Sequence, residues 1–114
     1  MIPKIRTWNS ETKEIEVFKT YEEISELFLA LSADDGFYSI MQSTGLFDKN
    51  NKEIFEGDIV LVLDSPYTVF YDNEKGSYRL KPHDDRWNVD YMSNFSHGGN
   101  FEIIGNIYEN KELL

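Results

Sequence analysis

The sequence contains no cysteine among its 114 residues, so disulfide bonds and thiolate chemistry are excluded. Such a chain is compatible with a reducing compartment, and we expect a cytoplasmic protein. No apolar run approaches the roughly 20 residues that a membrane-spanning helix needs, and the first residues lack the apolar segment of a secretory signal. We therefore expect a soluble protein that does not enter membranes.

Basic residues are also scarce, because 11 Lys and Arg stand against 21 Asp and Glu and give a formal net charge of -10. This charge opposes the approach of phosphate backbones and anionic lipids, so we expect no direct binding of nucleic acid. The carboxylates are spread along the chain, and solubility is the simplest explanation for them. The alternative is an acidic decoy or regulator that engages a DNA-binding protein by imitating phosphate charge.

Recognisable catalytic motifs are missing as well. There is no Gly-x-Ser-x-Gly turn, no glycine loop for phosphate and no dinucleotide pattern, so we expect no enzyme and no cofactor. A hydrolase that uses His83 or His97 would need these imidazoles to converge with carboxylates in one cleft. Both histidines lie in the least regular region, which favours surface loops. The acidic and amide residues between Asp48 and Glu53 lack the spacing of a calcium loop, so we predict no metal site there.

The residues that are present favour one domain with a hydrophobic core, since 40% are hydrophobic and 15% aromatic. Residues 5–8 and 15–18 are typical of two short strands around a turn at 9–11. A helix follows, in which we expect Thr20 to cap the first turn and Glu23 to reach back to it. One apolar stripe, for a core or a partner, consists of Tyr21, Ile24, Leu27, Phe28 and Leu31.

Short strands dominate after Gly36, the residue expected to end the helix with a positive φ. We predict strands or hairpins at 37–42, 44–58, 58–64, 67–72, 77–82 and 101–109, the last broken at Gly105 by a bulge or a bend, and a long irregular segment at 82–100. The fold class is α+β, mostly β: a small barrel-like antiparallel sheet preceded by a strand hairpin and one amphipathic helix. A strand-helix unit, 1–36, and a β-rich unit, 37–114, form a single cooperative domain.

The stretch "MQSTGLFDKNNKEIFEGDIV", residues 41–60, resembles the signature of the YopX family of phage and prophage proteins. "KIRTWNSETKEI" is similar to the family's N-terminal strand and turn, and "FEIIGNIYENKELL" to its closing pattern. The chain departs from the family at three places, where Asn51 replaces a glycine, Phe55 a tyrosine and Lys111 a proline. Asn51 preserves the turn, because asparagine tolerates a positive φ better than other non-glycine residues.

The resemblance implies a protein carried by bacterial viruses or their integrated relatives, with no assigned catalytic reaction. It also implies assembly of several chains, which suits a chain this small. Together with the missing catalytic motifs and the aromatic residues between Trp87 and Phe95, it leads us to expect a non-catalytic accessory protein that forms homo-oligomers and binds a host or phage protein.

Four polar residues of the signature, Gln42, Thr44, Glu56 and Asp58, are not explained by hydrophobic alternation. They either tie backbone groups together at the ends of the hairpin or form a binding site, and we favour the structural role. This role predicts that Glu56 and Asp58 bond to nearby backbone or to a basic residue.

Interleaved aromatic and basic residues are the candidates for contact with a partner protein, since Trp, Tyr and Arg are frequent binding anchors. Core packing is the alternative for Trp8. For the stretch from Arg86 to Phe95, the neighbouring acidic residues make a nucleic acid an unsuitable ligand. The predicted contact residues are Arg6, Trp8, Arg86, Trp87, Tyr91 and Phe95.

Overall fold

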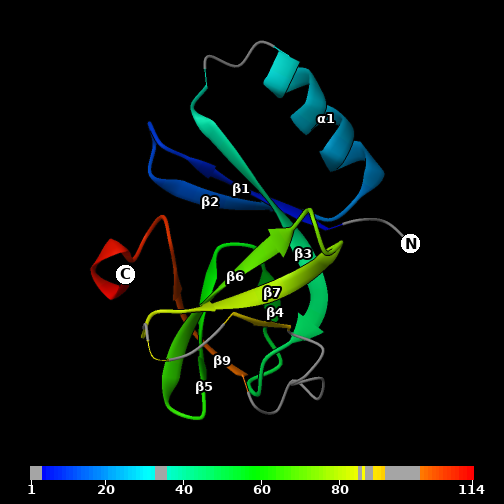
Figure 1. Cartoon of the computed structure of the whole chain (residues 1–114). Helices are drawn as coiled ribbons and strands as arrows, with labels where there is room; N and C mark the ends of the chain where they lie inside the picture. The colour runs from blue at the N-terminus through cyan, green and yellow to red at the C-terminus, as the bar shows by residue number, and fades with distance from the viewer. Residues whose placement is uncertain (1–3, 33–35, 85, 87–88, 92–100) are drawn as a thin grey trace. The chain divides into compact units, whose positions relative to one another are not determined.

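A computed structural model of the chain describes residues 4–32, 36–84, 86, 89–91 and 101–114 (Figure 1). The chain divides into two units, which we call unit 1 (Met1–Ser43) and unit 2 (Thr44–Leu114). The division falls inside strand β3 (Tyr38–Phe47), beyond the seam at Gly36 that the sequence indicated. Strands predominate beside one α-helix, which confirms the α+β, mostly β class.

Unit 1 contains β1 (Ile5–Asn9), β2 (Glu14–Phe18), α1 (Tyr21–Ser32) and the first part of β3. β1 lies between β2 and β3 and is antiparallel to both. The predicted turn between β1 and β2 is confirmed. The side-chain Oδ1 of Asn9 accepts hydrogen bonds from the amides of Glu11 and Thr12, at 2.9 and 3.1 Å.

Side chains satisfy the free amides at the start of α1. Thr20 Oγ1 accepts a hydrogen bond from the Glu23 amide at 3.1 Å, so the predicted cap is confirmed. The Glu23 carboxylate accepts from the amide of Lys19 at 2.8 Å, one residue before the expected target. No helix among the described residues has the length and apolar content that crossing a membrane requires.

α1 packs on the sheet through a narrower stripe than the sequence indicated. Ile24 and Leu27 are buried and form a cluster with Ile5 of β1 and the partly buried Phe18 of β2. Tyr21 and Phe28 are 67% and 57% exposed, so core packing, one of the two roles left open for the stripe, applies to Ile24 and Leu27 and not to these two residues. The Leu31 side chain lies outside the described residues.

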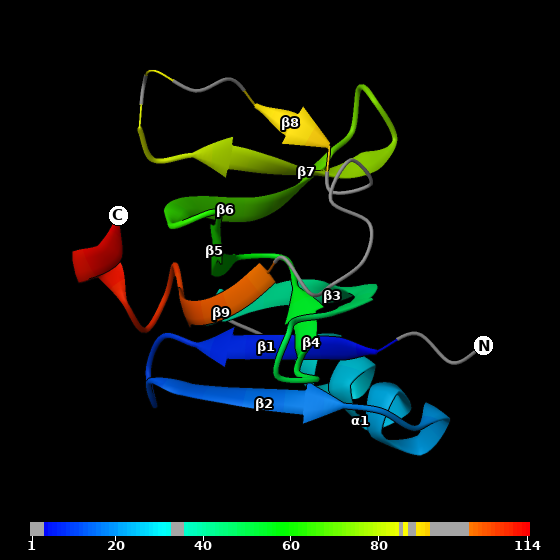
Figure 2. The same ribbon diagram turned by 90° about the horizontal axis from the view of Figure 1, so that it is seen from below.

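Unit 2 holds the last part of β3 and a five-stranded antiparallel sheet in the order β8-β7-β6-β5-β9. In Figure 1, β6 and β7 run across the direction of β5 and β9, and in Figure 2 β5 is seen nearly end-on beside β6, so the sheet curls as a barrel-like structure requires. The remaining elements are β4 (Glu53–Phe55), β5 (Asp58–Val62), β6 (Ser65–Asp72), β7 (Ser77–Pro82), β8 (Asp90–Tyr91), β9 (Phe101–Asn106) and the 3-10 helix η2 (Lys111–Leu113).

The strands of the described residues exceed the six or seven that the sequence indicated, because β4 and β8 are too short to show a periodic pattern. β5 ends at Val62 rather than at residue 64. Leu63 and Asp64 have φ of 51° and 65° and form a two-residue turn into β6. The hairpin between β6 and β7 is confirmed, with Gly76 at a φ of 62°.

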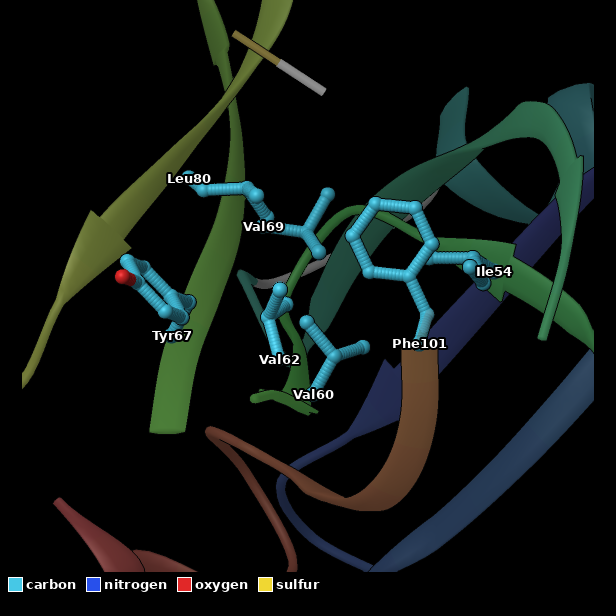
Figure 3. Close-up of a cluster of buried hydrophobic side chains, with 7 residues drawn as sticks. All are labelled: Ile54, Val60, Val62, Tyr67, Val69, Leu80 and Phe101. Carbon is cyan, nitrogen blue, oxygen red and sulfur yellow. The ribbon is translucent and has the colours of Figure 1, made fainter. Parts of the chain in front are cut away.

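The core of unit 2 gathers around Phe101 of β9, whose ring points towards Val60, Val69 and Ile54 (Figure 3). The other buried members of this cluster are Val62, Tyr67 and Leu80. The register between β5 and β9 shifts between Ile59 and Val60, which leaves an extra residue on β9. This irregularity confirms the bulge predicted next to Gly105.

Candidate functional site

The signature segment forms the hairpin of β3 and β4, and Thr44 ties its two sides together. Thr44 Oγ1 donates to the Ile54 carbonyl at 2.8 Å and accepts from the Leu46 amide at 3.1 Å. The hydroxyl therefore donates its proton and accepts one hydrogen bond inside the hairpin. This result confirms the structural role expected for Thr44.

Asp48 organises the turn between β3 and β4. Its Oδ1 accepts from the amides of Asn50 and Lys52, each at 2.9 Å, and its Oδ2 accepts from the amide of Ile103 on β9 at 3.1 Å. Burial acts to raise the pKa of Asp48, but these hydrogen bonds outweigh it and lower the pKa below the ordinary 3.8. Asn51 adopts a φ of 63° in this turn, which confirms the prediction that asparagine takes the positive φ of the family's glycine.

The second half of the signature contains Asp58, whose buried carboxylate accepts a hydrogen bond from the Phe55 amide at 2.8 Å. The prediction that Asp58 bonds to nearby backbone is confirmed. Glu56 is half-buried and lies close to Tyr78, whose pKa is raised by burial and by the charge of Glu56. Gln42 is exposed on β3, opposite Ile5.

A tight polar turn closes β9. Asn106 Oδ1 accepts from the amides of Tyr108 and Glu109 at 3.0 and 2.8 Å, and Asn106 Nδ2 donates to Glu109 Oε1 at 2.9 Å. Asn110 Oδ1 accepts from the Asn106 amide at 3.0 Å. A Cβ on Gly105 would lie 2.5 Å from Asn110 Oδ1, so only glycine lets the turn close this tightly.

The signature and the closing turn are one structural assembly within unit 2. The amide of Ile107 donates to the Gly57 carbonyl at 2.9 Å, and Asp58 pairs with Asn106 across the sheet. The Lys49 amide donates to the Phe101 carbonyl at 2.9 Å. The polar residues of both motifs therefore hold backbone segments together, as a scaffold does.

A second polar cluster stabilises the hairpin of β6 and β7. Asp72 Oδ1 accepts from the amides of Glu74 and Lys75, and its Oδ2 pairs with Arg79 Nη1 at 2.8 Å. The bond to Arg79 is the main cause that lowers the pKa of Asp72. The rings of Tyr71 and Tyr78 pack edge to face on the same strands, with centroids 5.1 Å apart. This cluster is explained by the turn it holds.

The first two predicted contact residues, Arg6 and Trp8, are buried on β1, at 8% and 9% exposure. Arg6 Nε donates to the sulfur of Met41 at 3.3 Å, and Met41 is its neighbour on β3. Neither residue presents the exposed side chain that contact with a partner requires. Core packing, the alternative for Trp8, agrees with this placement.

The remaining predicted contact residues fall largely outside the described part of the chain. Trp87 and Phe95 lie outside it, and of Tyr91 only the backbone, in β8, is described. Arg86 is exposed and forms a two-pronged pair with Asp84, with Nη2 2.6 Å from Oδ2. This hydrogen-bonded guanidinium lowers the pKa of Asp84 to about 2.

His83 has a structural environment. Its Nε2 is 2.7 Å from Thr68 Oγ1, and its Nδ1 is 3.0 Å from the Leu113 carbonyl. Because a carbonyl only accepts, Nδ1 must carry a proton here. His97 lies outside the described residues. Within the described chain, no group of three or more His, Asp or Glu side chains is arranged to hold a metal ion.

The model of the YopX protein family matches residues 1–114, the full length of this sequence. The chain belongs to the YopX family. Its fold is also similar to that of the crystal structure of protein EF1440 from Enterococcus faecalis, with a TM-score of 0.63 and 28% identity. That similarity covers 100% of this chain and 99% of EF1440. None of the curated proteins compared with the chain matches it.

YopX membership gives the polar motifs a structural explanation and brings no molecular function with it. Within the segments that resemble the family, Asp48 and Lys49 bond the hairpin of β3 and β4 to β9. A surface for function must therefore be sought elsewhere on this YopX protein.

Such a surface lies on α1, whose apolar stripe the sequence predicts to face either a core or a partner. The outer face of α1 consists of Tyr21, Ser25, Phe28 and Leu29, which are all exposed. Residues three, four and seven apart share one side of a helix, so these residues form a continuous strip without charge. Leu29 is 72% exposed. The signal was present in the sequence, because the apolar residues of α1 span more of the helix than one contact can bury.

Proposed function

We propose that this YopX protein is a non-catalytic accessory protein of a phage or prophage, which acts in the host cytoplasm by assembling with its own copies and binding another protein. The outer face of α1 carries this proposal. Tyr21, Phe28 and Leu29 expose large apolar side chains close together, and contiguous apolar patches mark interaction sites. Glu22 and Glu26, both exposed, border the strip as a polar rim borders an interface.

A second copy of the chain is the occupant that this face suits. Two copies of α1 can pack against each other around a twofold axis, since the same strip then faces itself. The helix has no charge along the strip that such packing would bury. The family resemblance to assembling proteins and the small size of the chain support the same arrangement.

The alternative role as an acidic decoy has the charge of -10 as its support. Several carboxylates, however, serve the fold: Asp48, Asp58 and Asp72 each accept hydrogen bonds from backbone amides. Their positions follow from turns rather than from phosphate spacing. The interaction module is therefore the proposal that we prefer.

Sedimentation velocity tests self-assembly. We expect the wild-type protein to form an oligomer, and the double variant Phe28→Asp/Leu29→Asp to raise the dissociation constant at least about tenfold, because buried anchors typically contribute more than 1 kcal/mol each. Leu63→Asn is the matched control, since Leu63 is 85% exposed and belongs to unit 2 rather than to α1. A wild-type protein that stays monomeric would refute assembly. An oligomer that the α1 variant leaves intact would refute this face as its site.

A further inference from the structure

β2 is an open edge of the sheet in unit 1. It pairs with β1 on one side only, in the register Ile5 to Phe18 through Asn9 to Glu14. Among the described residues, nothing bonds to the outer backbone groups of Glu14–Phe18. Figure 2 shows β2 as the outermost strand beside β1. An open edge of this kind offers a row of unpaired donors and acceptors to a further strand.

The edge of β9 in unit 2 is covered by other parts of the chain. The amide of Ile103 donates to Asp48 Oδ2, and the carbonyl of Phe101 accepts from the Lys49 amide. At the far end, Asn110 Oδ1 accepts from the Asn106 amide. Side chains and a turn thus occupy backbone groups along β9, whereas β2 has no comparable cover.

The charges on β2 select the strand that can be added. Glu14 and Glu16 point to the same face, and both are exposed. A second copy of β2 in antiparallel pairing would bring these carboxylates close to their counterparts, which is destabilising. A strand with Lys or Arg at alternate positions would instead form favourable cross-strand pairs. The opposite face of β2 carries Ile15 and Val17, which suit apolar residues at the intervening positions.

The basic groups near β2 do not remove this preference. Lys13 and Lys19 are exposed and stand just outside the two ends of the strand. Arg6 is opposite Val17, but it is buried and belongs to the face that carries Ile15 and Val17. The face with Glu14 and Glu16 therefore remains acidic.

We propose that the outer edge of β2 binds an extended segment of another protein, with basic residues alternating with apolar ones, as an added strand of the unit 1 sheet. This inference rests on the proposed interaction role and names the chemistry of the partner. It uses β2 and not the outer face of α1, so the two surfaces fail or succeed independently.

A peptide test uses the full chain and an acetylated, amidated peptide with three Lys residues alternating with Val. Isothermal titration gives the dissociation constant, and amide hydrogen exchange locates the binding. We expect binding together with slower exchange of amides in β2. A control peptide of the same composition, with its Lys and Val residues in separate blocks, should bind at least about tenfold more weakly, because it loses the cross-strand pairing.

Charge reversal gives the second arm. Glu14→Lys/Glu16→Lys should weaken the Lys-Val peptide at least about tenfold and create binding of a peptide with Glu in place of Lys. The matched control Glu74→Lys/Glu112→Lys makes the same change of charge at two exposed positions of unit 2 and should alter the affinity less than about threefold. Equal weakening in both variants, equal binding of both peptides, or unchanged exchange in β2 would overturn the inference. Sedimentation of the same samples reports separately on self-assembly.

Discussion

The Asp48 carboxylate stabilises both the turn between β3 and β4 and the edge of β9. It accepts from three amides, and two of them, those of Asn50 and Ile103, come from parts of the chain that are far apart. Asparagine at this position would offer one accepting oxygen and an NH2 group that cannot accept. The ionised carboxylate is therefore specifically required.

The depressed pKa of Asp48 predicts a loss of stability in acid. The folded pKa lies below 3.8, so the unfolded chain takes up the proton first, and this contribution is complete above pH 3.8 and lost as the pH falls through the folded pKa. Asp48→Asn should cost about 1–3 kcal/mol at neutral pH and flatten the decline below pH 3.8. Urea denaturation at a series of pH values measures the cost of the substitution and the dependence of the free energy of unfolding on pH. If this free energy falls equally steeply with acid in variant and wild type, Asp48 is not the group with the lowered pKa.

Gly105 predicts a steric effect, because its Cβ would meet the side chain of Asn110. Gly105→Ala should lower the free energy of unfolding by about 1–3 kcal/mol, since the asparagine must move and release the Asn106 amide. The measurement is a double-mutant cycle with Asn110→Gly, in which the cost of the alanine should largely disappear. An equal cost in both backgrounds would show that the crowding comes from elsewhere.

At the scale of elements, the hairpin of β5 and β6 carries its strain in a two-residue loop. Positive φ at both loop positions is typical of a type I′ turn, which favours Asn-Gly. Here the positions hold Leu63 and Asp64. A leucine with left-handed backbone and 85% exposure gains neither a favourable conformation nor burial.

Replacement of this loop should stabilise the protein. We expect Leu63→Asn/Asp64→Gly to raise the free energy of unfolding by about 1 kcal/mol or more, because asparagine and glycine adopt the left-handed conformation at less than the roughly 1–2 kcal/mol that it costs other residues. The midpoint of urea denaturation should rise with an unchanged slope. Leu63→Ile is the reverse test, since a β-branched residue suits positive φ still less. A stabilising isoleucine would contradict the turn assignment.

The elements differ in how far the sequence could predict them. α1 was predicted with its cap at Thr20, because capping depends on residues adjacent in the chain. The sequence does not show which side of α1 is exposed, because Tyr21 and Phe28 have the same spacing as the buried residues. Which side of a helix meets the sheet is decided by tertiary packing. The end of β5 was missed for a related reason, since Leu63 continues an apolar pattern while its backbone turns.

At the scale of the whole molecule, the family and the fold class could be read from motifs, and the candidate site could not. The family segments place Asp48, Asp58 and Asn106 in the chain, but only the structure shows that they bond one assembly together. The open edge of β2 depends on which strands pair, which local patterns do not encode. Both proposed surfaces are therefore properties of topology and packing rather than of any motif.

β9 has a consequence for the order in which unit 2 folds during synthesis. β5 and β6 are joined by two residues, whereas β5 and β9 pair across the long segment between Val62 and Phe101. Closing that loop costs more chain entropy, so we expect the hairpins of β5, β6 and β7 to form first and β9 to pair last. Until Phe101 leaves the ribosome, Val60 and one side of β5 stay uncovered. During that interval the nascent chain is most prone to pair with its neighbours and most dependent on chaperones.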